Sequence, residues 1–233
     1  MYQRVHNVEA TPDIPRRLPR GTHGLDPSLV AASQRTRLLE AVGRAVAHKG
    51  YAAATIEDIV RDAGVSKKTF YEHFSDKLDC FLAAYEAASD ELLAHMREAQ
   101  EAAGVGGAPA AGSAPGADGG EWLARTRAGI HAYLRWLAAE PELARVFLIE
   151  IAAAGPEALE LRERMRERYA ERMRELQVGN GVPDEIFHAV VAGADDLVVR
   201  RLREGRELLE LEPTLLYLQV SLLAGPNAAA QLA

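Results

Sequence analysis

Apolar residues recur at helical spacing along most of the chain from Ser33 onward. In the stretch 33–51 they fall three and four residues apart, and Lys49 followed by Gly50 is a typical helix end. No stretch alternates between apolar and polar residues for long enough to predict a strand. The pattern therefore predicts an all-α protein.

The same periodicity predicts two short helices and one long helix after the first, and then four or five more. Their expected ranges are about 55–63, 66–74, 75–103, 121–139, 141–154, 157–177, 183–204 and 207–224. Prolines stand at or near the starts of three of them, at positions 141, 156 and 183, where a missing N–H costs little.

Two segments lack this periodicity. Residues 1–32 hold four prolines and no sustained period, which indicates a flexible N-terminal arm. Residues 103–120 consist mostly of Gly, Ala and Pro, which bury little apolar surface, so we expect a flexible loop there. No internal repeat is present.

One short run, TIEDIVRDAGVSKKTFYEHF at residues 55–74, contains two helix starts separated by a glycine. Thr55 and Asp58 form a T-x-x-D start signal, and the isoleucines and valine that follow supply a buried face of about two turns. Gly64 ends this helix, because a sharp turn there needs a residue that tolerates positive φ.

Ser66 can cap the next helix, in which Phe70 and Phe74 are expected to point into the core. Two short helices joined by a tight turn form a helix-turn-helix, whose second helix fits a DNA major groove. Lysines favour phosphates, and threonine and tyrosine offer hydroxyls to phosphates or bases. The side chains expected to face outward are Lys67, Lys68, Thr69, Tyr71 and His73, with Lys77 placed for the DNA backbone in the following helix.

The net charge of −7 argues against a polyanionic partner, but the charge is uneven. Residues 1–80 carry 12 Lys and Arg against 10 Asp and Glu, so the acidity lies in the rest of the chain. For Arg16, Arg17 and Arg20 in the arm, an idle tail and a minor-groove contact both remain open.

Residues 34–85 resemble the N-terminal domain of TetR-type (tetracycline-repressor-like) transcriptional regulators. The run TIEDIVRDAGVSKKTFYEHFSDK carries the resemblance, although Leu78 stands where an acidic residue is common in the family. The resemblance implies a homodimer, an inverted-repeat operator, and a repressor released by a small-molecule effector. It also implies DNA contacts at Thr55, Ser66, Lys67, Lys68, Thr69, Tyr71, His73 and Lys77.

We therefore expect a flexible arm at 1–32, a three-helix DNA-binding domain at 33–80 and a helical regulatory domain at 81–233. The resemblance assigns the last two helices, 183–204 and 207–224, to a four-helix dimer interface, and their many apolar residues agree with this. We expect a pocket for a largely apolar ligand among the helices of 121–178. Its candidate lining residues are Trp122, His131, Tyr133, Trp136, Phe147, Glu150 and Tyr169.

Other features favour ordinary structural roles. The lone Cys80 lies among apolar residues, which favours a buried thiol over a redox sensor. The Arg/Glu-rich run 161–176 favours a solvated helix face with an apolar inner stripe. Asp196 stands four residues before Arg200, so an ion pair is favoured over a catalytic dyad with Asp195.

An enzyme is the competing class, but the chain has no nucleophile elbow, no phosphate-binding glycine loop and no clustered histidines. We expect no cofactor and no metal site. Two further classes stay open, a protein-interaction adaptor and a ligand-indifferent regulator. No apolar run is long enough to span a membrane, and residues 1–20 hold charges and prolines where a signal peptide is apolar, so we expect a cytoplasmic protein.

Overall fold

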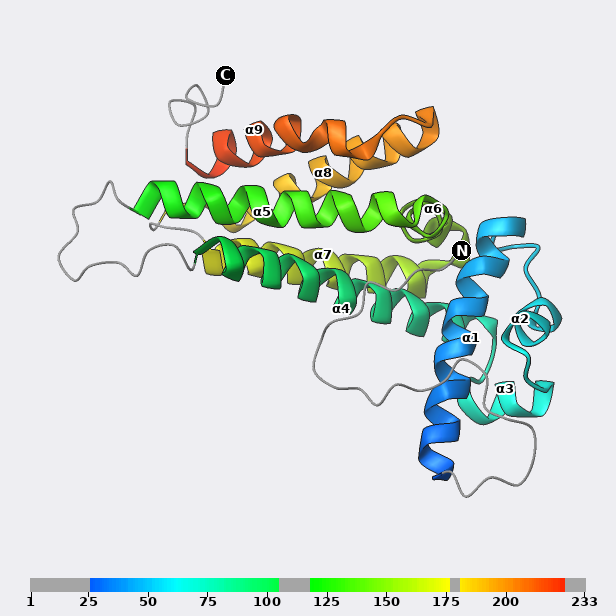
Figure 1. The fold of residues 1–233 in the computed structure, drawn as a ribbon. Coiled ribbons are helices and arrows are strands. Elements are labelled where there is room, and N and C mark those ends of the chain that lie inside the picture. Colours follow the sequence, from blue (N-terminus) through cyan, green and yellow to red (C-terminus); the bar gives the residue numbers. More distant parts are fainter. Residues whose placement is uncertain (1–25, 105–117, 177–180, 225–233) are drawn as a thin grey trace.

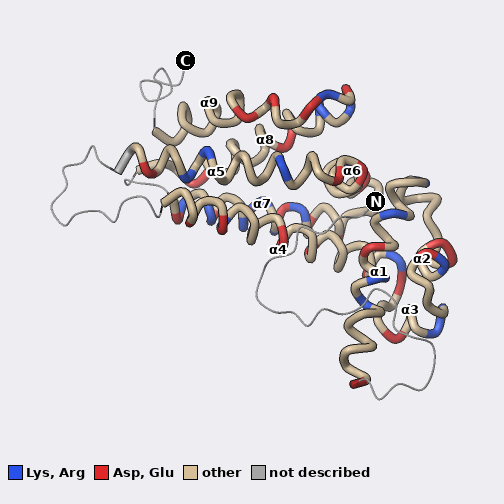
Figure 2. Tube along the Cα trace, in the orientation of Figure 1, with Lys and Arg blue, Asp and Glu red and all other residues tan. Residues whose placement is uncertain are grey.

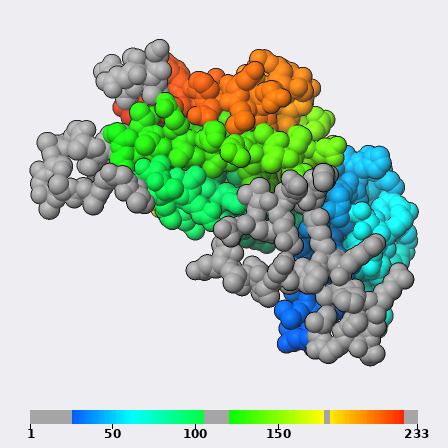
Figure 3. Space-filling model, in the orientation of Figure 1, coloured from blue at the N-terminus to red at the C-terminus, as the bar shows by residue number. Residues whose placement is uncertain are grey.

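The protein is helical throughout its described part, and a small unit lies at one end of a larger helical bundle (Figure 1). The computed structural model describes residues 26–104, 118–176 and 181–224, and no strand occurs in these ranges. Figure 3 shows the small unit, coloured blue to cyan, against the green to orange bundle. The all-α prediction is confirmed.

The small unit consists of three helices, and a fourth leads from it into the bundle. They are α1 (Pro27–Lys49), α2 (Ile56–Ala63), α3 (Lys67–His73) and α4 (Lys77–Gly104). In α1–α3 the helix-turn-helix pair packs against α1, as the sequence predicts.

In the view of Figure 1, α5 runs along the middle of the bundle, with α4 and α7 below it and α8 and α9 above it, and α7 also packs directly against α8. Its elements are α5 (Asp118–Ala139), α6 (Pro141–Leu148), the 3₁₀ helix η1 (Glu150–Ala154), α7 (Pro156–Leu176), α8 (Asp184–Glu204), the 3₁₀ helix η2 (Leu208–Leu211) and α9 (Glu212–Leu223). The short α6 and η1 lie at the end of the bundle that meets α1. No described helix is both long enough and apolar enough to cross a membrane.

The first helix begins earlier than the sequence pattern predicts. Asp26 caps α1 by accepting a hydrogen bond from the backbone N–H of Ser28 at 2.9 Å, and Pro27 occupies the first turn. The end of the predicted 1–32 arm is therefore helical. The arm arginines lie outside the described residues.

Three other predicted segments differ from the structure. Both ends of the predicted 103–120 loop are helical, because α4 continues to Gly104 and α5 begins at Asp118; residues 105–117 lie outside the described part. The predicted helices 141–154 and 207–224 each divide into an α-helix and a 3₁₀ helix. Apolar periodicity does not distinguish these two helix types over a single turn.

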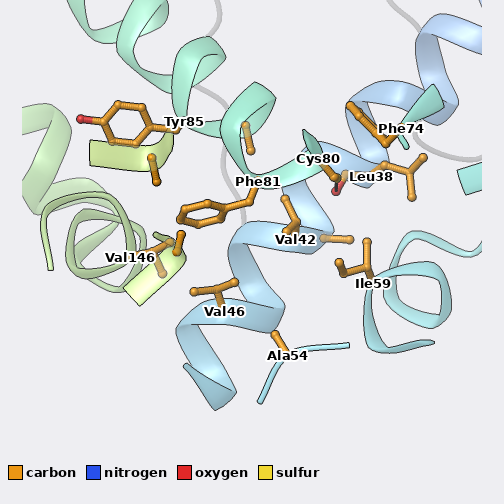
Figure 4. Packing of buried hydrophobic residues seen from close by; sticks show 14 of the residues in the cluster. Leu38, Val42, Val46, Ala54, Ile59, Phe74, Cys80, Phe81, Tyr85 and Val146 are labelled. Atoms are coloured by element: carbon orange, nitrogen blue, oxygen red, sulfur yellow. Dashed lines mark hydrogen bonds between the residues drawn. The ribbon is translucent and has the colours of Figure 1, made fainter. Parts of the chain in front are cut away.

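One apolar core runs through the small unit and into the bundle (Figure 4). Leu38, Ile59, Phe70 and Phe81 are completely buried, and the same cluster continues to Val146 of α6. The predicted domain boundary at residue 80 therefore does not separate two cores, because the first core contains residues from both sides of it. A displacement of α6 or α4 must repack side chains that also hold the helix-turn-helix.

The remaining bundle helices share a second core, with Leu134 of α5 facing residues such as Val190 of α8 and Leu215 of α9. Cys80 is buried in the first core, as predicted, and its thiol lies 3.8 Å from the carbonyl oxygen of Leu38. Burial raises the pKa of Cys80 to about 12, which opposes thiolate chemistry.

Candidate DNA interface and internal cavities

Thr55 begins α2 through a complete capping box. The Thr55 hydroxyl accepts a hydrogen bond from the Asp58 backbone N–H at 3.2 Å, and the Asp58 carboxylate accepts one from the Thr55 N–H at 3.2 Å. Lys49 also donates to Asp58, at 2.7 Å. The Lys49 ammonium, with the Thr55 hydroxyl, holds the pKa of Asp58 well below its usual range, so this cap stays ionised.

The turn between the two helices has the expected glycine geometry. Gly64 has φ 64° and ψ 39°, a left-handed conformation that side-chain-bearing residues adopt at a cost. Val65 then donates to the Val60 carbonyl at 3.1 Å, and the hydroxyl of Ser66 caps α3 by accepting from the Thr69 N–H at 3.0 Å. Local sequence signals thus set the angle between α2 and α3.

The outer face of α3 presents most of the predicted polar side chains. The side chain of Lys68 is 89% exposed and Tyr71 is 57% exposed, so both are available to a partner. Lys67 is exposed and pairs with Glu57 of α2. Thr69 is partly buried beside the Ser66 cap.

Two predicted contact residues have inward partners. The ring of His73 is partly buried and lies 3.4 Å from the side-chain oxygen of Gln34. Lys77 differs more from the expectation that it faces a DNA backbone: its ammonium donates to the carbonyl oxygens of Tyr51 at 2.7 Å and Ala54 at 2.9 Å. Both carbonyls belong to the loop before α2, and the Lys77 ammonium is the donor that satisfies them.

Two neighbouring cavities lie in the bundle. We call the first the aromatic cavity; it lies between α4, α5, α6, α7 and α8. Its lining residues are Tyr85, Ala88, Ser89, Leu92, Tyr133, Trp136, Leu137, Phe147, Leu148, Arg166, Tyr169 and Asp195.

We call the second the aliphatic cavity, because seven of its fifteen lining residues are methionine or branched aliphatic. Its lining residues are Met96, Gln100, Thr126, Ile130, Tyr133, Tyr169, Arg172, Met173, Val190, Val191, Ala194, Asp195, Leu215, Leu218 and Gln219. Tyr133, Tyr169 and Asp195 line both cavities and form their shared wall.

Four of the seven predicted pocket residues, Tyr133, Trp136, Phe147 and Tyr169, line these cavities. The other three do not. Trp122 is buried in the second core, and His131 is exposed with its Nδ1 2.7 Å from Glu212. Glu150 lies at the junction with the small unit, where its carboxylate accepts from the Tyr51 N–H at 3.3 Å. The prediction chose these residues by side-chain type, which does not show whether a residue faces the cavities, the core or solvent.

The sequence interpretation missed a charged cluster at the shared wall. The Asp195 carboxylate lies 2.9 Å from Arg166 Nε and 3.3 Å from an amino group of Arg162. A signal was present, because Asp195 follows buried Val191 by four residues and precedes buried Val198 by three, and so falls on the inner face of α8.

The Arg/Glu-rich helix α7 is consequently less solvated than predicted. Figure 2 shows basic and acidic residues interleaved along it, yet the side chains of Arg162 and Arg172 are only 16% and 15% exposed. Arg172 donates from Nε to Gln100 at 2.8 Å in the aliphatic cavity. The predicted ion pair between Asp196 and Arg200 is confirmed at 3.6 Å. No group of three or more His, Cys, Asp or Glu side chains suited to a metal ion occurs among the described residues.

The outer faces of α8 and α9 leave some apolar surface uncovered. Tyr217 is 55% exposed and Leu222 is 40% exposed, and Ala189 and Ala192 are exposed on α8. Val190, in contrast, is buried within its own chain. An interface on these helices would therefore use the outward residues rather than Val190.

Comparisons with known proteins agree with this arrangement. Residues 38–84 match the family model of bacterial regulatory proteins of the tetR family. A relative from Mycolicibacterium smegmatis, the HTH-type transcriptional activator FasR, is 39% identical over 66 residues, which are 28% of this chain and 30% of that protein. The sequence match thus spans less than a third of that relative's length.

Solved structures are similar over most of the chain. The fatty acid degradation regulator FadR from Bacillus halodurans superposes with a TM-score of 0.65 at 16% identity, over 79% of this chain and 97% of that one. FadR from Bacillus subtilis, solved in complex with stearoyl-CoA, gives a TM-score of 0.61 at 16% identity, over 82% and 98% of the two chains. At this identity the likeness concerns the fold.

Proposed function

Because its residues 38–84 make this chain a member of the tetR family of bacterial regulatory proteins, we propose that it regulates transcription as a DNA-binding homodimer. The proposal includes a repressor that leaves its operator when a small, largely apolar ligand enters the bundle. One observation carries this proposal. An exposed face of α3 lies at one end of a continuous core, and side chains of the same core line the aromatic cavity.

For DNA, we propose that α3 enters the major groove and that Lys68 and Tyr71 make the most accessible contacts. Their exposure supports this assignment. Thr55, Ser66, Lys67, Thr69 and His73 complete the proposed surface. Lys77 joins it indirectly, because the loop carbonyls that it holds lie just before the start of α2.

For the homodimer, we propose that the outward faces of α8 and α9 meet their copies across a two-fold axis. Exposed Tyr217 and Leu222 on α9 and the small residues of α8 support this surface. A two-fold dimer carries two recognition helices, so the operator is an inverted repeat with half-site centres roughly 10 to 17 base pairs apart.

For the ligand, we propose coupling through α6. Phe147 of α6 lines the aromatic cavity and also belongs to the core of the small unit, where its ring centroid lies 6.4 Å from that of Phe81 and 5.5 Å from that of Tyr85. On the far side of α6, a Cβ at Gly43 of α1 would lie 2.8 Å from Leu143. A ligand that displaces α6 would therefore push against both α1 and α4.

The size of the required effect is modest. A ligand that prefers the DNA-incompetent arrangement by about 3 kcal/mol would lower operator affinity roughly a hundredfold. The stearoyl-CoA complex of the FadR neighbour supports a ligand with a long apolar part in this fold.

The test uses labelled DNA from around the protein's own coding region and the purified full-length protein. We expect binding in a gel shift or anisotropy titration, and weaker binding in the presence of a ligand found by its thermal stabilisation of the protein. A protein that binds neither this DNA nor selected random DNA would be better described as a protein-interaction adaptor. A tight ligand that leaves operator affinity unchanged would favour the ligand-indifferent regulator.

Because the FasR relative is named an activator, the sign of regulation needs its own measurement. We expect a reporter behind the operator to be expressed more strongly when the regulator is deleted. Lower expression on deletion would instead indicate an activator.

A further inference from the structure

The two cavities adjoin each other at their shared wall, and their linings differ. On α5 alone, the lining residues run from Thr126 in the aliphatic cavity to Trp136 in the aromatic cavity, a rise of about 15 Å along the helix. Aromatic rings dominate one end, where flat groups stack or meet edge to face. Flexible methionines and branched aliphatic side chains are concentrated at the other, and these adapt to an alkyl chain.

The shared wall contains one polar group that lacks a partner. The hydroxyl of Tyr133 is buried and has no hydrogen-bond partner among the described residues. Its polar neighbours on the same wall are engaged, since Asp195 is paired with Arg162 and Arg166, and Tyr169 is hydrogen-bonded with Ser89. A buried hydroxyl without a partner is destabilising, so an acceptor that reaches it gains binding energy there.

The protonation of Tyr133 defines what kind of group it would meet. Burial, with a smaller contribution from the Asp195 charge, raises the pKa of Tyr133 well above its usual value. The phenol therefore stays protonated and can donate a hydrogen bond throughout the pH range of a folded protein.

The charges at the shared wall are already paired with one another, which disfavours a charged partner for this donor. A carboxylate placed at Tyr133 would compete with Asp195 for the guanidinium groups of Arg162 and Arg166, and an ammonium would compete with those guanidinium groups for Asp195. A neutral oxygen acceptor meets neither penalty. A carbonyl is the best match, because it accepts hydrogen bonds without adding a donor of its own.

We propose that the joined cavities take a neutral two-part amphipath: a flat ring lies in the aromatic cavity, an aliphatic chain lies in the aliphatic cavity, and a carbonyl oxygen between them accepts the hydrogen bond of Tyr133. This inference rests on the proposed function, because it specifies the ligand class of the same effector site. The contacts of Tyr133 with both cavities are what join the two halves.

The test compares octanophenone, an aryl ketone with an alkyl chain, with octylbenzene, which lacks the carbonyl. Binding to the full-length protein without DNA is measured by calorimetry. The wild type should bind the ketone about two- to tenfold more tightly, the range expected for one net hydrogen bond. Tyr133→Phe should remove this preference while keeping the affinity for octylbenzene, which also shows that the variant is folded.

Thr126→Val is the matched control. The Thr126 hydroxyl is also buried and without a partner among the described residues, but it lines only the aliphatic cavity, so this variant should keep the ketone preference. A preference that survives in Tyr133→Phe, or that disappears only in Thr126→Val, overturns the inference. Failure of the wild type to bind either probe overturns it as well.

The DNA-free measurement keeps this inference separate from the proposed function. If the protein prefers octanophenone through Tyr133 but stays on its operator when saturated with it, the proposed ligand class is supported and the proposed release mechanism is wrong. If another ligand releases the protein from DNA and the protein shows no ketone preference, the release mechanism is supported and the proposed ligand class is wrong.

Discussion

The ammonium of Lys77 lies 2.7 Å from the carbonyl oxygen of Tyr51 and 4.3 Å from the centroid of the same residue's ring. One side chain at the start of α4 therefore holds both the backbone and the ring of the loop that precedes α2. The Glu150 carboxylate accepts from the Tyr51 N–H on the other side, so Tyr51 connects α4, η1 and the helix-turn-helix.

Lys77→Met should destabilise the protein, because it leaves the Tyr51 and Ala54 carbonyls without their donor while keeping the aliphatic stem. Hydrogen bonds to charged groups contribute about 1.5 to 3 kcal/mol, so we expect a loss of about 2 kcal/mol in the free energy of unfolding. Urea unfolding followed by circular dichroism measures it. Unchanged stability together with a lower salt dependence of DNA binding would instead return Lys77 to the phosphate role.

Lys68→Ala should have the opposite profile. Its side chain is 89% exposed, so unfolding should be unaffected, whereas affinity for DNA of any sequence should fall. The slope of log affinity against log salt should decrease in magnitude by about 1, as for the loss of one phosphate contact. A slope equal to that of the wild type would remove Lys68 from the interface.

The double variant Tyr217→Glu with Leu222→Glu should yield a folded monomer that loses operator DNA. Both residues are exposed in the single chain, so the charges disturb only a surface that a second copy would cover. Sedimentation velocity reports the mass, and circular dichroism reports the fold.

Leu159→Glu is the control for that experiment, because Leu159 is 43% exposed on α7, which is not one of the two helices proposed to form the interface. It should leave the dimer intact. Should the double variant remain dimeric, the proposed interface would be wrong. Val190→Glu cannot serve here, since it would place a charge in the second core and unfold the chain.

Asp58→Asn should change how stability depends on acid pH. The folded-state pKa of Asp58 is depressed by Lys49 and Thr55, so its stabilisation is fully present above the unfolded value of about 3.9 and is lost as pH falls through the folded value. The variant should be less stable than the wild type at pH 7, and the difference should begin to shrink as the pH falls below about 4. Thermal melting between pH 3 and 7 measures this difference, and a constant difference across that range would contradict the role of the ionised cap.

The sequence by itself determined the local geometry of the helix-turn-helix. A T-x-x-D start at Thr55, a glycine at 64 and a serine cap at 66 each act within four residues, through hydrogen bonds and φ preferences that need no distant partner. The burial of Phe70 and Phe74 follows from helical spacing within the same short run. These predictions were right because their causes lie inside the segment.

Only the tertiary structure decided which side chains meet across helices. Periodicity shows that Asp195 lies on an inner face, but the partners Arg162 and Arg166 depend on how α7 and α8 cross. Trp122 and His131 stand on the same helix as Tyr133, and the packing around α5 places one in the core, one in solvent and one in the cavities. Lys77 likewise turns inward because a loop more than twenty residues away leaves its carbonyls within reach. The rotation and crossing of packed helices arise from the combined fit of many side chains, which no single stretch of sequence specifies.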